Sequence, residues 1–168
     1  EELQFPYTPG PDLYDLESYY KMLDLYFQFS RKVGLPIQEE NLLEERRNTE
    51  EEISGITDLI FTFKKSSNKS LGIVCKTEAQ AKSLADKLQI YIENVYFLSN
   101  QSSAFVQGIV ITSAHMAKGL EFDEVIIPQT DDKNYHSEID RSMLYVAVTR
   151  AMHRLTLTYS GTKHTLFI

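Results

Sequence analysis

The stretch GIVITSAHMAKGLEFDEVIIP, residues 108–128, consists of two apolar runs with a polar loop between them. The runs at residues 108–113 and 124–127 are short and rich in Val and Ile, which is typical of β-strands. A continuous apolar run such as residues 125–127 indicates a strand covered on both faces, as in a parallel sheet. Pro128 ends the second strand, because proline has no N–H group for the sheet ladder. The stretch therefore predicts two buried strands joined by a polar loop.

The rest of the chain alternates between strand and helix patterns. Further strands are predicted at residues 71–75, 95–98 and 154–159, and helices at residues 49–63, 77–92 and 137–152. Thr49 and Glu52 have the spacing of a capping box at the start of the first of these helices. Strands that alternate with helices pair in parallel through right-handed crossovers. We therefore predict an α/β fold with a central, mostly parallel sheet.

The first part of the chain is predicted to be separate from this sheet. A helical pattern extends over residues 13–33 and ends at the Gly-Leu-Pro sequence of residues 34–36, because proline cannot continue a helix. The polar residues 37–48 are predicted to form a loop. We therefore divide the chain into a helical lead-in, residues 1–36, and a main domain, residues 37–168.

The composition limits the classes of protein to which the chain can belong. Its 168 residues and 42% hydrophobic content are typical of one globular domain, and no apolar run reaches the ~20 residues of a membrane span. The start has no pattern of a secretory signal, and the single cysteine, Cys75, fits a reducing compartment, so we expect a cytoplasmic protein. The net charge of −7 predicts weak binding to nucleic acid by this chain alone. The four histidines have no metal-ligand spacing, so no metal site is predicted.

The loop inside residues 108–128 carries the first candidate site. Open α/β sheets bind ligands at the carboxyl ends of their strands, where we expect this loop to lie. Gly119 allows the backbone to approach a ligand closely, and Lys118 is a cation suited to a phosphate or a carboxylate. Glu121 lies between two apolar residues, where a carboxylate needs a hydroxyl or a cation as partner. A solvated connection with a helical turn is the alternative interpretation.

The last predicted helix carries the second candidate. A rotation of about 100° per residue places Ile139, Met143, Val146 and Ala147 on one apolar face, with Arg150 in its middle. A guanidinium there requires a partner, because burying an unpaired charge is costly. An internal salt bridge, a contact with the helix C-terminus and a snorkelling side chain are three structural explanations. The functional alternative is an anion supplied by another molecule, which the planar donors of arginine suit.

Residues 108–128 closely resemble motif V of the UvrD/Rep-like superfamily 1 helicases, whose core reads T-x-H-x-A-K-G-L-E-F. The sequence LYVAVTRAMHRLTL at residues 144–157 resembles motif VI of the same family, with its Y-V-A-x-T-R-A centre. The spacing from Tyr135 to Tyr145 resembles the helicase IV (HelD) branch. The resemblance implies a RecA-like (P-loop NTPase-type) three-layer domain at residues 37–168, the second of the two RecA-like domains of such helicases.

The resemblance also implies roles in nucleotide binding. In such helicases ATP lies between two RecA-like domains, and the arginine of motif VI reaches its γ-phosphate as an arginine finger. This role is carried over to Arg150, which would stabilise the charge of phosphoryl transfer. By the same matching, Glu121 would hold the ribose and Gly119 would lie near the phosphates, while Lys118 would link the nucleic-acid backbone to the nucleotide site.

Contacts with nucleic acid are carried over in the same way, onto Thr112 and His115. The resemblance implies single-stranded DNA as the ligand and an N-terminal RecA-like domain of the same parent chain as the partner. The sequence has no G-x-x-x-x-G-K-[ST] motif, so the first RecA-like domain with its phosphate-binding loop is expected to be missing. ATP with Mg²⁺ is therefore expected only in the intact parent, and this chain alone is expected to be inactive.

Other readings of the sequence remain open. A family motif with a core like N-Y-R-S normally precedes motif V, and its nearest counterpart here has Tyr20 in the place of arginine, so no role is carried over to that residue. One alternative function is an ATP-independent RecA-like module that binds a protein such as RNA polymerase. Another is a degenerate nuclease or regulatory subunit of a recombination complex, for which the C-terminal tail lacks the expected acidic cluster.

Overall fold

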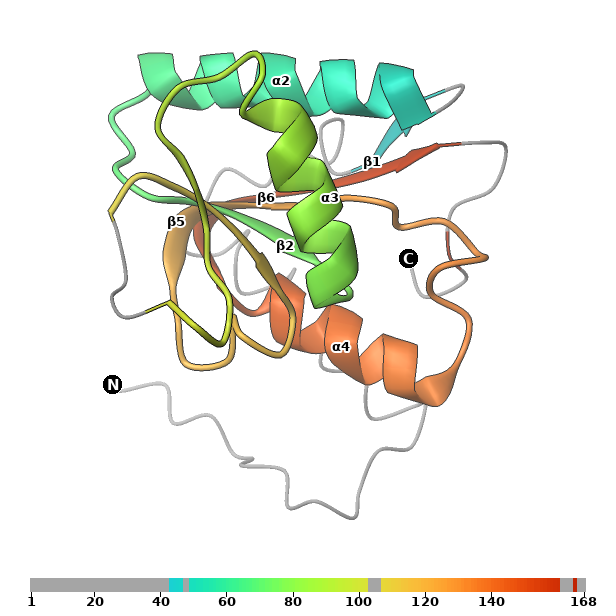
Figure 1. Cartoon of the computed structure of the whole chain (residues 1–168). Coiled ribbons are helices and arrows are strands. Elements are labelled where there is room, and N and C mark those ends of the chain that lie inside the picture. The colour runs from blue at the N-terminus through green and yellow to red at the C-terminus, as the bar shows by residue number, and fades with distance from the viewer. Residues whose placement is uncertain (1–42, 47–48, 103–106, 161–164, 166–168) are drawn as a thin grey trace, which may run out of the picture. The chain divides into compact units, whose positions relative to one another are not determined.

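The computed structural model describes residues 43–46, 49–102, 107–160 and 165 (Figure 1). For residues 43–46 it describes the backbone alone. All of these residues belong to one compact unit of the chain, Ile37–Ile168. The helical lead-in predicted at residues 1–36, including Tyr20, lies outside the described residues.

The described strands form one sheet in which every neighbouring pair is parallel. Their order across the sheet is β1-β6-β5-β2-β4-β3. The bounds are β1 (Leu43–Arg46), β2 (Leu71–Cys75), β3 (Val95–Phe97), β4 (Ile109–Ser113), β5 (Phe122–Ile127) and β6 (Ala151–Ser160). The prediction of an α/β fold with a mostly parallel sheet is confirmed.

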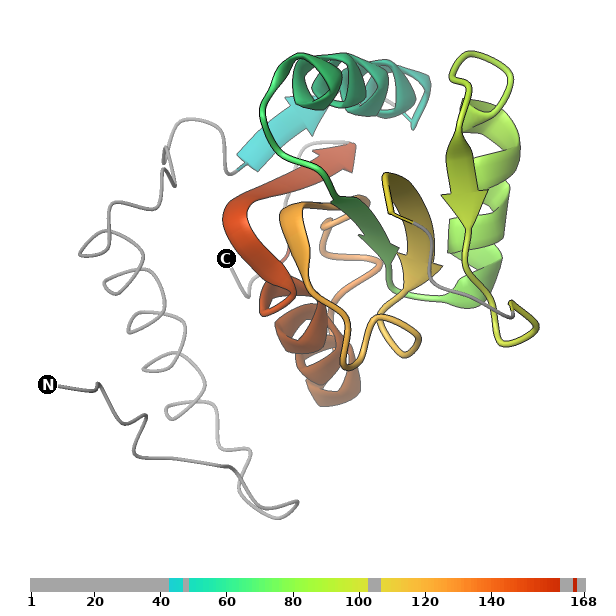
Figure 2. The ribbon, with the colours of Figure 1, turned by 90° about the vertical axis from the view of Figure 1, so that its left-hand side faces the viewer.

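Within the described part of the chain, three helices cover the two faces of this sheet. Helices α2 (Thr49–Lys65) and α3 (Glu78–Leu88) lie on one face, and α4 (Glu138–Val148) lies on the other (Figure 2). The sheet order explains this arrangement. The connections from β1 to β2 and from β2 to β3 advance in one direction across the sheet, whereas those from β4 to β5 and from β5 to β6 return. Because parallel crossovers are right-handed, the two directions place their connections on opposite faces.

The main core lies between the sheet and helices α2 and α3. All five residues of the central strand β2 are buried, and the strand packs against apolar side chains of both helices. Gly72 of β2 allows the ring of Phe122 to approach the backbone, because a Cβ atom there would lie 2.5 Å from the ring. Burial, with a smaller effect of the Glu52 charge, raises the pKa of the Cys75 thiol to about 12. Cys75 is therefore a small core residue, as predicted.

Residues 43–46 form a strand where the sequence predicts a loop. The backbone of β1 pairs in parallel with β6, from Leu43 opposite Leu157 to Arg46 opposite Ser160. β1 is the last strand on its side of the described sheet, and its charged sequence Leu-Glu-Glu-Arg is typical of a sheet edge and gives no apolar strand pattern. The loop prediction is therefore wrong at these residues.

Two helices end earlier than the sequence predicts. Helix α3 ends at Leu88 and not at residue 92, and α4 ends at Val148 and not at residue 152. The chain leaves α4 early because Ala151 already pairs with Phe122 in the sheet. Arg150 therefore lies in the turn between α4 and β6 and not inside a helix.

The capping box predicted at Thr49 and Glu52 is wrong. Helix α2 begins at Thr49 itself, and the Glu52 side chain is buried. Its Oε1 atom accepts hydrogen bonds of 2.7 Å from the Gln129 N–H and of 2.7 Å from the Thr158 hydroxyl. Glu52 thus ties α2 to β6 and to the segment after β5.

Within the described ranges, none of the helices combines the length and the apolar character that a membrane span requires. In the same ranges, no three or more His, Cys, Asp or Glu side chains gather in a way that could hold a metal ion.

Candidate functional site

The predicted site residues are divided between the two edges of the sheet. We call the edge where the parallel strands begin the amino edge, and the edge where they end the carboxyl edge. Leu71 of β2 pairs with Ile109 of β4 and with Glu124 of β5, so the three strands share both edges. The connection at residues 114–121 leaves β4 at the carboxyl edge and returns to the amino edge, where β5 begins. The expectation that the whole loop lies at the carboxyl edge is therefore wrong.

This β4–β5 connection folds into tight turns on the face of the sheet that α4 covers (Figure 2). It is attached at its start by the hydrogen bond from the Ala114 N–H to the Cys75 carbonyl, 2.8 Å. The Ala117 N–H donates to the Ser113 carbonyl at 2.9 Å, and Ala117 is fully buried. Gly119 has a φ of +85°, which a side chain would strain, although a Cβ atom there would meet only open space. The turn therefore needs glycine for its backbone conformation.

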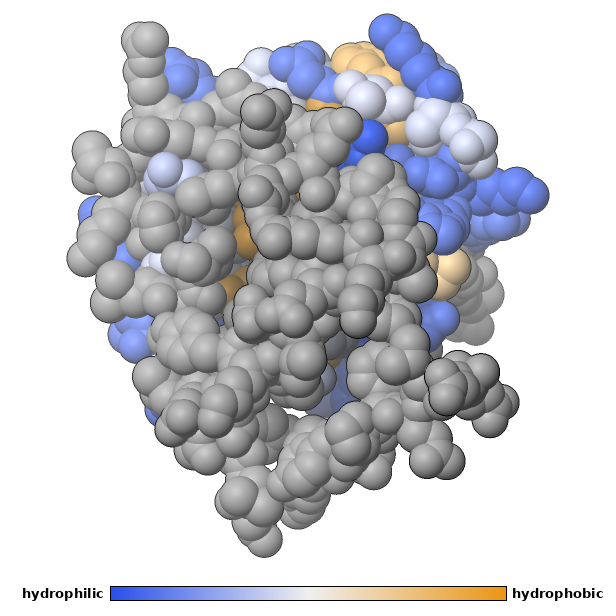
Figure 3. Space-filling model, turned by 180° about the vertical axis from the view of Figure 1, so that it is seen from behind, coloured by the Kyte–Doolittle hydropathy of each residue, from blue (hydrophilic) through white to orange (hydrophobic). Residues whose placement is uncertain are grey.

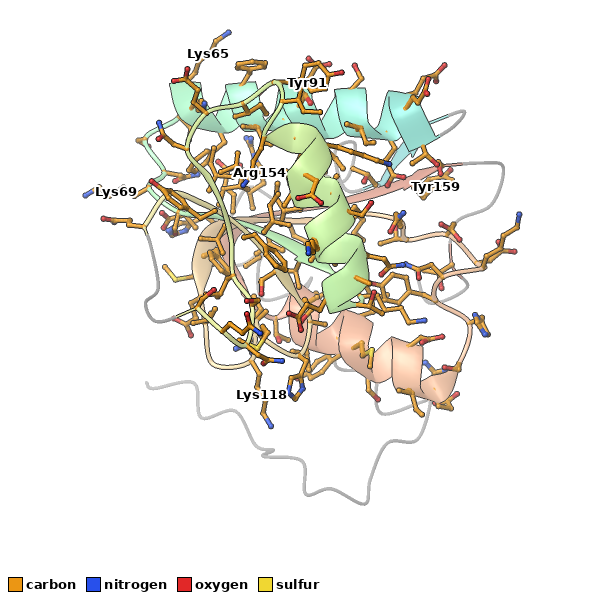
Figure 4. All side chains as sticks on the ribbon, viewed as in Figure 1. Lys65, Lys69, Tyr91, Lys118, Arg154 and Tyr159 are labelled. Carbon is orange, nitrogen blue, oxygen red and sulfur yellow. The ribbon has the colours of Figure 1, made fainter. Side chains whose placement is uncertain are left out.

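Most of the predicted residues of this connection face solvent. His115, Lys118, Gly119 and Glu121 are exposed, and Lys118 projects away from the sheet (Figure 4). Their exposure leaves the side chains of His115, Lys118 and Glu121 free to contact another molecule.

Arg150 is held by three neutral oxygen atoms. Its Nε donates to the Val146 carbonyl at 3.1 Å, and Nη2 donates to the Thr149 hydroxyl at 3.0 Å. Its Nη1 donates to the Leu120 carbonyl of the β4–β5 connection at 3.2 Å. In the part of the chain that the structure describes, no carboxylate oxygen lies within 4.0 Å of the Arg150 guanidinium. Of the three structural explanations, the contact with the helix C-terminus is therefore found, and the internal salt bridge is not.

Glu121 lies beside Arg150 at the amino edge. The residue before it, Leu120, accepts a hydrogen bond from the Arg150 side chain, and the residue after it, Phe122, donates its N–H to the Arg150 carbonyl at 2.9 Å. Residues from motif V and motif VI are thus joined through both side chain and backbone. The fold brings together Arg150 and Glu121, which are far apart in the sequence.

The buried face of α4 differs from the predicted one. Ile139 is 69% exposed, and the buried side chains of the helix are Asp140, Arg141, Leu144, Ala147 and Val148. The helix is turned so that Asp140 points inward, where it forms an ion pair with Lys76. The buried apolar residues Leu144, Ala147 and Val148 have the i, i+3, i+4 spacing of a helix face, so the sequence did contain the signal for this face.

The Lys76–Asp140 pair is a feature of the carboxyl edge that the sequence analysis missed. Lys76 follows β2 directly, and its Nζ lies 2.5 Å from Asp140 Oδ1 and 2.6 Å from the Asn134 carbonyl oxygen. The ammonium group also lies 5.7 Å from the centroid of the Tyr135 ring, where a cation–π contact forms. The Lys76 charge is therefore fully matched inside the domain.

Asp140 in turn caps α4. It accepts hydrogen bonds from the N–H groups of His136 and Ser137, and Ser137 is the N-cap residue of the helix. Burial alone would raise the pKa of the Asp140 carboxyl, but the bonds from Lys76 and from these N–H groups hold it well below its usual value. The Ser-x-x-Asp spacing at residues 137–140 was the sequence signal for this cap.

Thr112 and His115 lie near the carboxyl edge but differ in exposure. Thr112 is fully buried, and its hydroxyl donates to the Leu98 carbonyl at 3.0 Å. It therefore holds β4 against the segment that follows β3. His115 is exposed at the beginning of the β4–β5 connection. Their contacts with nucleic acid stay predictions.

A second arginine near the amino edge provides a contrast to Arg150. Arg154 of β6, labelled in Figure 4, has a carboxylate partner, because its Nη1 lies 3.7 Å from Glu124 Oε2. Asp123 accepts from the N–H groups of Lys69 and Ser70 at 2.7 and 2.9 Å. Burial acts to raise the pKa of Asp123, but these bonds lower it overall. Both carboxylates of this strand are thus used inside the domain.

Comparison with known proteins gives three findings. A family model described as the UvrD-like helicase C-terminal domain matches residues 12–162. DNA helicase II of Escherichia coli (strain K12) and DNA helicase II of Salmonella typhimurium (strain LT2) are each 34% identical over 73 residues, 38% of this chain and 10% of each relative. The crystal structure of the C-terminal domain of a possible DNA helicase from Lactobacillus plantarum WCFS1 superposes with a TM-score of 0.66 and 28% identity, over 75% of this chain and 77% of that chain. The chain therefore matches only a small part of the length of the two helicases.

Proposed function

The chain belongs to the family of UvrD-like helicase C-terminal domains, and we propose that it is the C-terminal motor domain of an ATP-dependent DNA helicase or translocase. In this proposal it supplies an arginine finger and contacts to nucleic acid. ATP is held by an N-terminal RecA-like domain of the same parent chain, across a domain interface.

The state of Arg150 is the observation that supports this proposal most directly. Its guanidinium is positioned by three neutral oxygen atoms and has no carboxylate partner among the described residues. A positioned but uncompensated arginine suits a γ-phosphate, because the planar group donates several hydrogen bonds to phosphate oxygens. The Val146 and Leu120 carbonyls and the Thr149 hydroxyl would keep the group oriented before a phosphate arrives.

The neighbours of Arg150 fit a bound nucleotide. Glu121 is exposed beside it and would accept hydrogen bonds from the ribose hydroxyls. The exposed backbone at Gly119 and the Lys118 ammonium would lie near the phosphates. ATP with Mg²⁺, bound to the first domain, supplies the phosphoryl group that is transferred to water. The role of this chain is to stabilise the charge that develops during that transfer.

Nucleic acid would bind at the opposite edge of the sheet. His115 is exposed at the carboxyl edge, and Thr112 fixes the strand that carries it. We propose single-stranded DNA as the ligand. Because the chain has a net charge of −7, other domains of the parent would provide most of the binding energy for the DNA. The β4–β5 connection runs from the nucleic-acid edge to the nucleotide edge, so it would link the two sites.

The test is ATP hydrolysis by the intact parent, with and without single-stranded DNA. Arg150→Ala is expected to lower kcat by about 10³-fold or more, the usual effect of an arginine finger, while nucleotide binding changes far less. Arg154→Ala is the matched control, because Arg154 is paired with Glu124 inside the domain. Equal turnover of the Arg150→Ala and wild-type proteins would contradict the finger. A parent without any DNA-stimulated hydrolysis would favour the ATP-independent protein-binding module, for which RNA polymerase is the candidate partner.

A further inference from the structure

A groove runs between helices α2 and α3, on the face of the sheet opposite to Arg150. It consists of two hollows of about 270 and about 810 Å³, and Ile53 and Lys87 line both of them. We call it the α2–α3 groove and define it by Glu52, Ile53, Phe61, Gln80, Lys87 and Tyr91, which line one or both hollows. It plays no part in the proposed nucleotide and nucleic-acid contacts.

The two ends of the groove differ in chemistry. Both helices begin at the carboxyl edge, where Glu52 and Gln80 line the smaller hollow. The larger hollow is lined by Phe61 and Tyr91, which are 46% and 69% exposed, and by Ile90, which is 73% exposed. Tyr91 lies beside α2 in Figure 4. Figure 3 shows the molecule from behind, on the side away from α3, where a separate hydrophobic area is visible at the level of α2 among hydrophilic residues. Three large exposed apolar side chains in one hollow are typical of an interaction surface.

The Glu52 carboxylate is the most informative group of the groove. It is 2% exposed, and both of its hydrogen bonds, from Gln129 and Thr158, go to Oε1. Among the described residues, no Lys, Arg or His nitrogen lies within 4.0 Å of this carboxylate. A buried carboxylate that has only neutral partners is costly, because the lost hydration is not replaced by an opposite charge. Glu52 therefore offers a strong site for a cation that enters the smaller hollow.

We propose that the α2–α3 groove binds a segment of a partner protein that places an Arg or Lys side chain beside Glu52. Apolar side chains of the same segment would pack against Phe61, Ile90 and Tyr91. A positive charge complements Glu52, which would repel the phosphates of a nucleic acid. A helix of 17 residues such as α2 is about 25 Å long, so a segment of similar length would span the groove. Lys87 is exposed where the two hollows meet, and its positive charge would repel a second basic residue in the middle of the bound segment.

The experiment selects binders from a display library of random peptides of about 12 residues against the 168-residue chain. We expect the enriched peptides to share one Arg or Lys and a separate pair of apolar residues. An enriched peptide is then synthesised with arginine and with citrulline, which has the same shape but no charge. The arginine peptide is expected to bind the wild-type chain at least tenfold more tightly than the citrulline peptide. In Glu52→Gln, which keeps an acceptor for Thr158 and Gln129, this difference should disappear.

Two surface variants check that the apolar end takes part. Tyr91→Ser is expected to weaken the arginine peptide at least fivefold, whereas Tyr96→Ser, at a tyrosine that is 41% exposed on β3 outside the groove, should leave it unchanged. Melting temperatures confirm that all variants are folded, and Glu52→Gln should melt no lower than the wild type. Binders without a basic residue, or binding that is indifferent to Glu52→Gln, would overturn the proposal. So would a dimer of the chain that Tyr91→Ser dissociates, because the occupant would then be a second copy.

Discussion

Helix α4 has a cation at each end, and the two cations are in opposite electrostatic situations. At its start, Lys76 contacts the Asp140 carboxylate at 2.5 Å and the Asn134 carbonyl at 2.6 Å. Just past its end, Arg150 contacts the Val146 and Leu120 carbonyls and a hydroxyl, all neutral. The charge of Lys76 is neutralised by Asp140, whereas among the described residues no carboxylate oxygen lies within 4.0 Å of the Arg150 guanidinium.

This difference separates a structural cation from one that is available to a ligand. The helix dipole is not its cause, because Asp140 at the helix start and Arg150 at the helix end both complement the dipole. The cause is the Asp140 carboxylate beside Lys76, which has no counterpart beside Arg150 in the part of the chain that the structure describes. We infer that the Lys76–Asp140 pair fixes α4 on the sheet, and that the positioned helix presents Arg150, which has no carboxylate partner among the described residues, to an anion.

Among the variants that test this comparison and leave Arg150 in place, the largest effect is expected from giving Arg150 a carboxylate of its own. In Thr149→Asp, the new carboxylate would replace the hydroxyl that accepts from Arg150 Nη2 at 3.0 Å, and Arg150 would then resemble Lys76. We expect DNA-stimulated turnover of the intact parent to fall by about 10²-fold or more, a large part of an arginine finger's effect. Steady-state ATP hydrolysis measures this. Thr149→Asn is the neutral control, and equal loss in both variants would mean that geometry and not charge is responsible.

The second effect concerns stability and the other end of α4. Lys76→Met leaves the Asp140 carboxylate, which is largely buried, without its cation. We expect a loss of about 2 kcal/mol in the free energy of unfolding, below the range for fully buried pairs because Lys76 keeps some exposure. Urea denaturation of the chain measures it. Lys76→Arg should recover most of the lost stability. A Lys76→Met protein as stable as the wild type would contradict the inference that the Lys76–Asp140 pair fixes α4 on the sheet.

A smaller effect is expected at the turn that supplies the Leu120 carbonyl to Arg150. Gly119→Ala forces an alanine into a φ of +85° without any steric contact, so its cost is purely conformational, about 1 kcal/mol. Because Leu120 is the next residue, turnover of the parent should fall by only a few fold. Urea denaturation and ATP hydrolysis together test this. If Gly119→Ala lowered turnover as much as Thr149→Asp, the Gly119 turn would have to contact the nucleotide directly and not only lie near its phosphates.

The strands and helices could be predicted from the sequence where the hydrophobic pattern of a segment matches its burial in the folded domain. The apolar run of β2 predicted its bounds, Leu71–Cys75, because a central strand is buried on both faces. Strand β1 could not be predicted, since only its pairing with β6 makes its polar sequence extended. Glu52 has the spacing of a capping residue, but its hydrogen bonds go to Gln129 and Thr158, at positions 77 and 106 residues away.

The candidate site was predictable in its residues but not in its arrangement. Motif matching selected Glu121 and Arg150, and the structure places them together at the amino edge. The separation of His115 from them depends on the return of the β4–β5 connection across the sheet, which follows from the strand order and not from any local pattern. Lys76 and Asp140 are 64 positions apart, so no sequence window contains their pair.

The smallest effect is a dependence of stability on pH. The folded state lowers the pKa of the Asp140 carboxyl from an ordinary value of 3.8, through Lys76 and two N–H groups. Because the unfolded chain binds this proton more tightly, the stability that Asp140 contributes is complete above pH 3.8 and declines as the pH falls below that value. Asp140→Asn removes the titrating group but keeps an acceptor for the helix cap. Urea denaturation should therefore show a gap between wild type and Asp140→Asn that is constant at neutral pH and narrows in acid. If the difference in unfolding free energy between the two proteins stayed constant in acid, the charge of Asp140 would contribute nothing to stability. The contrast between a neutralised Lys76 and an Arg150 without a carboxylate partner among the described residues would then have no energetic basis.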